Sequence, residues 1–487
     1  MNVREAASLM GAAVSGVNPK LFDKQINDFS IDSRSVKAGE LFFALSQKDY
    51  VRAGFNGDFA DGHQYIENAF QSGAVAAVAR ADRVVGDAML EALKDRLLLV
   101  DDAIAALQTL AHRVYQAWAK PVVGITGSAG KTTAKELTAH LLGQAGKRVL
   151  KSERNYNNGL GLPLSVLRMV SEGRSPEQFD LAVLEMGMSS PTHEIQRLCA
   201  ITPPDVGVEL MVAPVHLEYL GSIENIAAAK AELIEGLKPG GTAVLNADDE
   251  WVMKMREKHH GRTLTFGIEH AADVTARDID TSHLGLMKFV LQTPFGESGA
   301  TLHMSGRHNL MNALAASAVA TYFEIAPEKI AAALATAVPP RMRGEVLRFA
   351  RGFTVVDDSY NSNPRSLINM VRTITEAGVE AKRRIVIAGE MLELGPEEVS
   401  LHRGAGREIA SLGVDVLWGI RGLGGEIVAG AKATGIETRF FETSDEAAAA
   451  IVVELREGDL VLVKGSRGVA TDRIVAAIRA KFALAGG

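Results

Sequence analysis

Short apolar runs alternate with alanine-rich helical patterns along nearly the whole chain. The runs have the length of buried strands, and the patterns between them have the length of helices. This alternation predicts α/β units with mainly parallel sheets, because parallel strands are joined by crossover helices. In the first half of the chain, strands are predicted at residues 41–45, 74–79, 97–100, 121–125, 181–185, 206–212 and 242–246.

In the second half of the chain, the alternating pattern is interrupted by a polar stretch and then by a double proline. A more polar, β-like stretch covers residues 274–304, and a helix is predicted at 309–322. Pro339-Pro340 then marks a linker, because proline cannot continue a helix. Loops at the carboxyl ends of parallel strands bind ligands, so the last unit is expected to form a second wall of a shared site. Its strands, each followed by a polar or glycine-containing loop, are predicted at residues 353–356, 384–388, 414–418 and 460–463.

One predicted strand runs directly into a loop of small residues. The apolar run 121–125 is followed by the loop 126–130, and a helical pattern starts at Lys131. Glycines let such a loop close around phosphate oxygens, the lysine reaches the β- and γ-phosphates, and a neighbouring threonine hydroxyl binds Mg²⁺. The general P-loop has a glycine where this chain has Ile125, so the glycine spacing is shorter here. A glycine-rich turn with an exposed lysine is the alternative, but the order of strand, loop and helix favours a nucleoside triphosphate site.

Composition narrows the class of protein. The 487 residues suggest about three domains. A net charge of −7 argues against nucleic-acid binding, which needs a basic face. The single cysteine, Cys199, excludes an internal disulfide, and the first residues lack the apolar core of a signal peptide. No stretch reaches the ~20 apolar residues of a membrane span, so a cytoplasmic protein without membrane insertion is expected.

Three single residues stand at positions of interest. Glu185 ends a predicted strand near the loop, where a carboxylate either holds nucleotide-bound Mg²⁺ or lies on the surface. His216 follows another apolar strand, but a lone histidine is more often structural than a ligand. Lys230 lies in a helical stretch, and by default it is a solvated lysine paired with Glu224 or Glu235.

Three polar clusters also allow two interpretations. The amides and glycines of residues 155–163 either orient a substrate carboxylate or form an Asx-rich turn. Residues 307–312 open a helix and either contact a base or ribose or cap that helix. Arg341 and Arg343 follow the double proline, where they either bind phosphate or belong to a basic linker.

Taken in chain order, these motifs resemble the Mur ligase family, and most closely its branch that adds D-alanyl-D-alanine. The short Gly-x-x-Gly-Lys-Thr loop is also typical of that family. One departure is the stretch 46–60, which is longer than the family pattern. The resemblance covers nearly the whole chain, through residues 32–34, 39–44, 61–63, 126–133, 155–163, 184–187, 216–218, 229–232, 307–312, 357–364, 389–395 and 464–467.

The resemblance implies a three-domain α/β enzyme. Residues 1–100 would form a small N-terminal α/β domain that binds the UDP end of the substrate through Ser33 and Arg34. Residues 101–338 would form a central P-loop ATPase domain with a parallel sheet, and residues 339–487 a Rossmann-like C-terminal domain. Asn155 and Asn158 are expected to contact substrate, and the implied ATP contacts are Thr126, Gly127, Ser128, Ala129, Gly130, Lys131, Thr132, Thr133, Asn312, Arg343, Asp358 and Asn361.

The reaction that the resemblance implies is ATP-dependent ligation of D-alanyl-D-alanine to UDP-N-acetylmuramoyl-tripeptide through an acyl phosphate, carried out by a monomer. Lys230 is expected as a carbamate, because CO₂ converts its cationic amine into an anion that can bind metal. The implied catalytic residues are Lys131, Glu185, His216 and Lys230, and two Mg²⁺ ions would be held by Thr132, Glu185, His216 and Lys230.

Two alternatives stay open. Another Mur-type ligase that adds a single amino acid, or a folylpolyglutamate-type ligase, would carry the same nucleotide site. A P-loop switch protein without ligase activity belongs to a different class, and it would give no reason for Glu185, His216 and Lys230 to converge.

Overall fold

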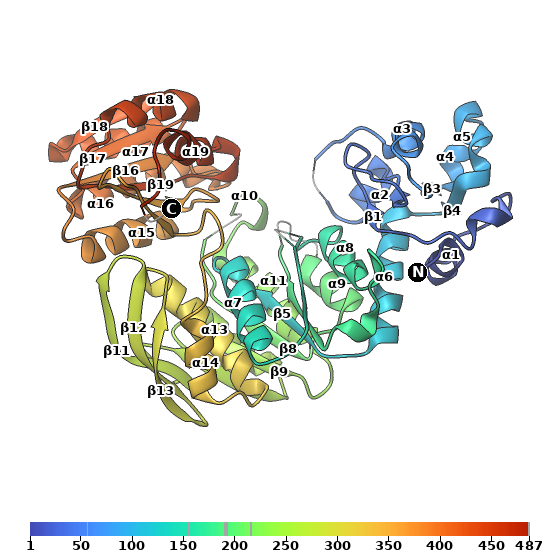
Figure 1. The fold of residues 1–487 in the computed structure, drawn as a ribbon, viewed down its shortest axis with the longest axis horizontal. Coiled ribbons are helices and arrows are strands. Elements are labelled where there is room, and N and C mark those ends of the chain that lie inside the picture. The colour runs from blue at the N-terminus through green and yellow to red at the C-terminus, as the bar shows by residue number, and fades with distance from the viewer. Residues whose placement is uncertain (56, 154–155, 189–192, 215–216, 486–487) are drawn as a thin grey trace.

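The structure, a computed structural model, describes all residues except 56, 154–155, 189–192, 215–216 and 486–487. Within the described residues the chain forms three separate sheets, whose strands lie in residues 29–100, 122–302 and 345–464. Figure 1 shows the N-terminal unit in blue and the C-terminal unit in orange and red at opposite ends of a central unit. None of the helices in the described part of the chain is long and apolar enough to span a bilayer.

The N-terminal unit is built on a parallel sheet with the strand order β1-β2-β3-β4. Its middle strands are buried on both faces, which explains why they read as continuous apolar runs in the sequence. The strands are β1 (Phe29–Ser30), β2 (Leu41–Phe43), β3 (Ala76–Arg80) and β4 (Leu97–Val100), and the helices are α1 (Val3–Met10), α2 (Gln47–Arg52), α3 (Ile66–Gln71), α4 (Ala81–Val84) and α5 (Ala88–Ala92).

The central unit has the strand order β13-β12-β11-β10-β9-β8-β5-β7-β6. It is parallel from β6 to β11 and ends in the antiparallel strands β11, β12 and β13. The strands are β5 (Val122–Thr126), β6 (Val149–Lys151), β7 (Leu181–Glu185), β8 (Val206–Glu209), β9 (Thr242–Asn246), β10 (Arg262–Gly267), β11 (Val274–His283), β12 (Leu286–Thr293) and β13 (Gly296–Leu302).

Helices cover both faces of this sheet. Ile125 and Val183 belong to the core beneath α7 and α13, whereas Leu184 and Met186 belong to the core beneath α9 and α11. The strand β5 therefore ends in the middle of a covered sheet, with β7 and β8 on either side. The helices are α6 (Ala103–Trp118), α7 (Lys131–Gln144), α8 (Gly161–Leu167), α9 (Glu194–Ile201), α10 (Leu217–Leu220), α11 (Ile223–Glu235), α12 (Glu250–Lys254), α13 (Arg307–Tyr322) and α14 (Pro327–Leu334).

The C-terminal unit has the strand order β14-β15-β19-β16-β17-β18, and only the pair β14–β15 is antiparallel. Helices α15, α16 and α17 pack on one face, and α18 and α19 pack on the other. The strands are β14 (Glu345–Arg348), β15 (Thr354–Asp358), β16 (Arg383–Gly389), β17 (Val416–Ile420), β18 (Glu437–Phe441) and β19 (Asp459–Lys464), and the helices are α15 (Pro364–Ala377), α16 (Glu398–Ser411), α17 (Gly424–Ala431), α18 (Ser444–Glu454) and α19 (Asp472–Lys481).

The predicted α/β class with mainly parallel sheets is confirmed. Two predicted strands, 41–45 and 206–212, are shorter in the structure, because β2 ends at Phe43 and β8 ends at Glu209. Beyond that point the backbone turns to the P-loop, and the Met211 carbonyl accepts a hydrogen bond from the Ser128 N–H at 2.8 Å. The domain limits at residues 100 and 338 stay predictions, and helix α6 packs against both α1 and α8 across the first of them.

A buried carboxylate anchors the long stretch 46–60. Its first part forms helix α2, which Ser46 caps by accepting a hydrogen bond from the Asp49 N–H at 3.1 Å. The fully buried Asp49 side chain forms an ion pair with Arg80 at the end of β3. Its second oxygen accepts a hydrogen bond from the Ala103 N–H at the start of α6, at 3.1 Å. Asp49 therefore joins three elements of the N-terminal half.

Replacing Asp49 by alanine is expected to lower the free energy of unfolding by about 3–5 kcal/mol, because Arg80 loses a buried partner. Asp82→Ala is the matched control: Asp82 also pairs with Arg80, but its side chain is 52% exposed, so the expected loss is about 1 kcal/mol or less. Urea denaturation of both variants measures the difference, and equal losses would contradict the structural role of Asp49.

Candidate active site

The loop after β5 is shaped by two glycines in left-handed or extended positive-φ conformations. Gly127 has φ 152° and Gly130 has φ 85°. A Cβ at Gly127 would lie 2.8 Å from the Leu210 Cβ, and one at Gly130 would collide with the Asn312 side chain. The loop therefore closes against the end of β8 and against α13, and neither glycine can be replaced without movement. Helix α7 begins at Lys131, so its first N–H groups face the loop, as in an anion-binding helix start.

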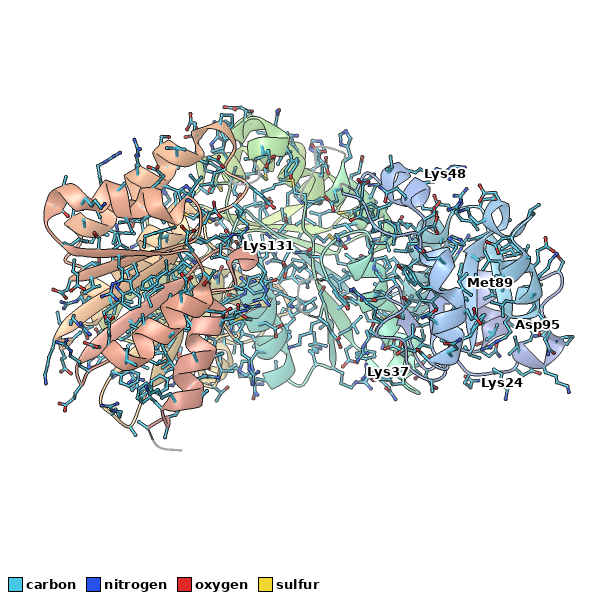
Figure 2. The ribbon with its side chains drawn as sticks, turned by 90° about the horizontal axis from the view of Figure 1, so that it is seen from above. Lys24, Lys37, Lys48, Met89, Asp95 and Lys131 are labelled. Atoms are coloured by element: carbon cyan, nitrogen blue, oxygen red, sulfur yellow. The ribbon has the colours of Figure 1, made fainter. Side chains whose placement is uncertain are left out.

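Lys131 bends back over this loop. Its Nζ donates a hydrogen bond to the Gly127 carbonyl at 2.8 Å. Burial lowers the pKa of Lys131, Arg343 lowers it further, and Glu185 and Glu209 oppose the shift. Figure 2 shows Lys131 where the central and C-terminal units meet, while Lys37 and Lys48 lie at the other end of the molecule. The predicted phosphate-binding lysine thus lies at the junction of two units.

Glu185 lies directly beside the P-loop threonine. It is 2% exposed, and its Oε2 accepts a hydrogen bond from the Thr132 hydroxyl at 2.8 Å. Its Oε1 accepts a hydrogen bond from the Asn157 amide, also at 2.8 Å. A hydroxyl and a carboxylate are hard oxygen donors of the kind that Mg²⁺ prefers, so these two residues fit such an ion. In the described part of the chain no cluster of three or more His, Cys, Asp or Glu side chains is arranged around a metal.

A buried lysine, Lys135, is linked to Glu185 through Ser152. Lys135, one turn after Lys131 on α7, is fully buried, and its Nζ donates to the Ser152 carbonyl at 2.7 Å. It also pairs with Glu136 at 3.0 Å. The Ser152 hydroxyl in turn accepts a hydrogen bond from the Glu185 N–H at 3.0 Å. Helix α7 therefore carries both the P-loop lysine and the support of the carboxylate beside it.

Lys230 lies on α11 and is 2% exposed, so the interpretation as a solvated lysine paired with Glu224 or Glu235 is wrong. Glu235 pairs with Lys258 instead, at 2.6 Å. Burial lowers the pKa of Lys230 to about 7, with a further contribution from Lys131. Among the described residues, no hydrogen-bond or ion-pair partner is found for the Lys230 amine.

Glu209, at the end of β8, is a charged residue that the sequence analysis missed. It is fully buried, and both carboxylate oxygens lack a hydrogen-bond partner in the described part of the chain. Burial raises its pKa to about 8, and the cations of Lys230 and Lys131 oppose the shift. Its only sequence signal was a carboxylate inside an otherwise apolar strand, and that signal does not distinguish a buried residue from a strand end at the surface.

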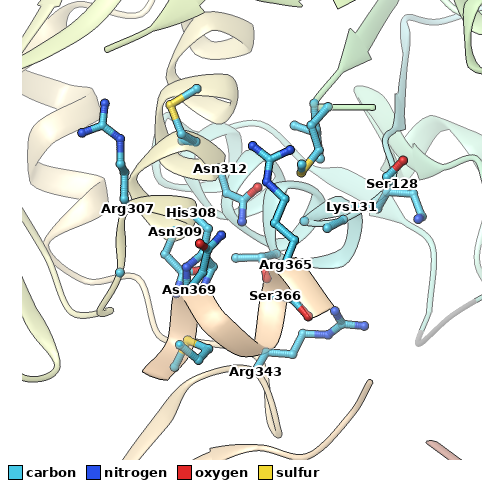
Figure 3. Close-up of a pocket in the computed structure, with 18 of the residues that line it drawn as sticks. Ser128, Lys131, Arg307, His308, Asn309, Asn312, Arg343, Arg365, Ser366 and Asn369 are labelled. Carbon is cyan, nitrogen blue, oxygen red and sulfur yellow. The ribbon is translucent and has the colours of Figure 1, made fainter. Parts of the chain in front are cut away.

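A cavity of about 1020 Å³ lies between the central and C-terminal units. Its walls include most of the predicted nucleotide contacts, and Figure 3 shows Lys131 and Asn312 facing side chains from the C-terminal unit. Arg343 stacks on the Tyr360 ring at 4.1 Å, and Asp358 pairs with Lys464 at 2.5 Å. The predicted nucleotide contacts that line the cavity are Ser128, Ala129, Gly130, Lys131, Thr132, Thr133, Asn312, Arg343, Asp358 and Asn361.

Other predicted site residues lie elsewhere. Thr126, Gly127 and Lys230 do not line this cavity, and Ser33 and Arg34 lie in the N-terminal unit outside it. The Arg34 guanidinium is 88% exposed and is held by the Asp32 carboxylate at 2.8 Å.

The structure describes Asn158 of the predicted substrate-binding loop, but not Asn155 or His216. Asn158 lines the cavity, and its Oδ1 accepts hydrogen bonds from the backbone N–H groups of Leu160 and Gly161 at 3.2 and 2.9 Å. Asn155 and His216 lie outside the described residues.

Comparisons with known proteins agree with this arrangement. The family model described as Mur ligase middle domain matches residues 125–320, and the model described as Mur ligase, glutamate ligase domain matches residues 342–467. The UDP-N-acetylmuramoyl-tripeptide–D-alanyl-D-alanine ligase of Bacillus subtilis is 33% identical over 463 residues, which cover 94% of each chain. The chain belongs to the Mur ligase family.

Solved structures of Mur ligases show the same fold as this one. MurF from Acinetobacter baumannii superimposes with a TM-score of 0.85 at 25% identity, covering 99% of each chain. MurF ligase from Thermotoga maritima, solved in complex with ADP, has a TM-score of 0.77 at 26% identity and covers 94% of this chain and 98% of its own. The similarity therefore includes all three units of this Mur ligase.

The structure of this Mur ligase also reveals site residues that motif reasoning did not single out. Asn157 donates to the second oxygen of Glu185, the Ser152 hydroxyl accepts from the Glu185 N–H, and Lys135 donates to the Ser152 carbonyl. His308 lines the cavity, and burial lowers its pKa although Asp358 opposes the shift. These contacts join residues that are distant in the sequence, and local signals existed only for Asn157 in the motif 155–163 and for His308 in the motif 307–312.

Replacing Lys135 by methionine in this Mur ligase is expected to weaken divalent-cation binding by about 10-fold, because residues that hold a metal ligand affect affinity by 10–100-fold. Manganese binding in the presence of ADP, followed by electron paramagnetic resonance, measures the effect without turnover. The matched control is Lys151→Met, since Lys151 pairs with the same Glu136 but is 47% exposed. A loss of thermal stability with unchanged manganese binding would show that Lys135 is only structural.

Proposed function

We propose that this Mur ligase joins D-alanyl-D-alanine to UDP-N-acetylmuramoyl-tripeptide and converts ATP to ADP and phosphate. The proposal rests on one observation above all: Lys131, Thr132 and Glu185 lie together on the wall of a cavity whose opposite wall is the C-terminal unit. This geometry suits a reaction in which the nucleotide is held by one unit and the acceptor enters from the other. The names of the similar ligases support the choice of substrates. We expect the enzyme to act in the cytoplasm as a monomer.

The chemistry follows from the weakness of a carboxylate as an electrophile. A carboxylate oxygen of the tripeptide attacks the γ-phosphorus of ATP in line, and the bond to the leaving ADP oxygen breaks. The amine of D-alanyl-D-alanine then attacks the acyl phosphate carbon, phosphate leaves, and the amine nitrogen loses a proton. In such a reaction the protein mainly positions the groups and neutralises charge. Lys131, the first N–H groups of α7 and Arg343 supply positive charge for the phosphates.

The residues fit the binding of magnesium. Thr132 and Glu185 would hold one ion, and Glu185, His216 and Lys230 would hold a second. Bound magnesium would neutralise phosphate charge during the transfer. Lys230 needs a modification for this role, since an ammonium repels a metal ion. Its buried amine, without a described partner and with a pKa lowered to about 7, is suited to react with CO₂ and form a carbamate.

Substrate binding is assigned by the family pattern. Ser33 and Arg34 of the N-terminal unit would hold the UDP end, and Asn155 and Asn158 would orient the peptide end. Asn158 lines the same cavity as the P-loop, which supports a substrate orientation in which the peptide end points toward the nucleotide. The ATP contacts would be those predicted from the sequence, Thr126 to Thr133 together with Asn312, Arg343, Asp358 and Asn361.

An acceptor assay tests the proposed function. Purified protein is given ATP, magnesium and UDP-N-acetylmuramoyl-tripeptide, and phosphate release is measured with D-alanyl-D-alanine or with single amino acids. Release that requires the dipeptide is expected. Release with a single amino acid would indicate another ligase of the family, and hydrolysis that needs no acceptor would indicate a P-loop switch.

A further inference from the structure

Six lysine and arginine side chains of the described residues line the interdomain cavity. Among the described residues, Arg365 is the only lysine or arginine of the cavity wall for which no hydrogen bond, ion pair or ring contact is found. The others are each engaged, namely Lys131 with the Gly127 carbonyl, Arg307 with Glu269, Arg343 with the Tyr360 ring, Arg372 with Glu408 and Lys464 with Asp358. An unpaired guanidinium among other cations is repelled by them, and binding of an anion would offset this repulsion.

The position of Arg365 indicates which anion. It lies in the first turn of α15, after Pro364 and the capping residue Asn363, and so belongs to the C-terminal unit. Figure 3 shows its side chain extending into the cavity toward the side where Asn312 and Lys131 lie. Asn312 in turn lies against Gly130 of the P-loop. The guanidinium therefore approaches the phosphate cradle from the opposite wall.

We propose that Arg365 binds the phosphate oxygens of ATP at the terminal end of the triphosphate. This inference rests on the proposed ATP-dependent function and adds a residue that the family pattern did not supply. The planar guanidinium presents paired N–H donors that match two phosphate oxygens. Because Lys131 belongs to the central unit and Arg365 to the C-terminal unit, the terminal phosphate is held from both walls. Transfer of this phosphoryl group from ATP to the substrate carboxylate, with ADP as the leaving group, then depends on both units being in place.

Nucleotide binding without turnover tests this assignment. The affinities of AMP, ADP and the non-hydrolysable analogue AMP-PNP are measured by calorimetry at fixed magnesium, with Arg365→Met and the unchanged protein. AMP-PNP is expected to bind about 10- to 100-fold more weakly to the variant, since hydrogen bonds to charged groups are lost. AMP is expected to bind equally to both proteins. Arg365→Lys should recover part of the loss, because it restores the charge without the paired donors.

Arg372→Met is the matched control. Arg372 lies seven residues further on the same helix and also lines the cavity, but Glu408 holds its guanidinium at 2.8 Å. This control variant is expected to bind all three nucleotides with unchanged affinity. Because Arg365 is exposed, its replacement is not expected to affect folding, and the melting temperature of the variant verifies this.

Three outcomes would overturn the assignment. Equal weakening of AMP and AMP-PNP would indicate a contact with the base, the ribose or the first phosphate. Unchanged nucleotide affinity with a higher KM for the acceptor would indicate that Arg365 binds the acceptor carboxylate. Unchanged affinity and unchanged kinetics would indicate a solvated arginine. Because the binding arm uses no acceptor, it stays informative even if the assay for D-alanyl-D-alanine ligation fails.

Discussion

Replacing Lys131 by methionine is expected to lower kcat by about 10³-fold, the upper range for losing one preorganised group that stabilises developing charge. The Lys131 amine donates a hydrogen bond to the Gly127 carbonyl at 2.8 Å, in the loop that would hold the phosphates. Burial lowers its pKa, and a bound phosphate would stabilise its positive charge. Methionine keeps the length of the side chain and removes only the charge and the donors. Steady-state phosphate release with saturating substrates measures the effect.

The control for this variant is Lys147→Met. Lys147 lies just after the C-terminal end of helix α7 and is exposed, so kcat of this variant is expected to be unchanged. A Lys131→Met enzyme that keeps more than a tenth of the normal kcat would contradict the phosphate-binding role. Loss of activity together with a lowered melting temperature would instead show a folding defect, so the melting temperature is measured for both variants.

Removal of CO₂ is expected to inactivate the enzyme, and Lys230→Ala is expected to lower kcat by about 10²–10³-fold. Both effects would have one cause: without the proposed carbamate, Lys230 would carry no anion toward the proposed metal site. The buried amine has a pKa lowered to about 7, so it is increasingly protonated below that pH and neutral above it. Only the neutral amine reacts with CO₂. Reactivation at a fixed concentration of dissolved CO₂ is therefore expected to be slow at pH 6 and to reach its full rate above about pH 8.

Labelled CO₂ provides the direct measurement. With ¹³CO₂, the unchanged protein is expected to give a carbamate signal in the nuclear magnetic resonance spectrum that Lys230→Ala lacks. Lys258→Ala is the control, because Lys258 is 45% exposed and paired with Glu235. An enzyme that keeps full activity in CO₂-free buffer, or a Lys230→Ala variant with normal kcat, would rule out the carbamate.

Much of the fold was predictable from local patterns. The strands at 97–100, 181–185 and 242–246 match β4, β7 and β9 in every residue, because each is a short apolar run bounded by polar residues. Strands β1, β6, β10, β14 and β18 were not predicted. All five are short or partly exposed, and all except β10 lie at the edges of their sheets, so their apolar signal is weak.

The candidate site was predictable only in part. The loop and helix of the P-loop were visible, because the phosphate cradle is made from consecutive residues. Glu185 beside Thr132 was expected from the end of its strand, and the distance of 2.8 Å confirms that they are neighbours. The catalytic and binding roles of all the site residues stay predictions until the variants are measured.

By itself, the sequence determined the class of fold, the nucleotide-binding loop and membership of the family, because these depend on the order of residues along the chain. The tertiary structure alone decided that Lys230 and Glu209 are buried, that Lys135 supports Glu185, and that Arg365 faces the P-loop from another unit. The reason is physical: burial and partner choice arise between side chains brought together by sheet order and unit packing, and no local pattern contains that information.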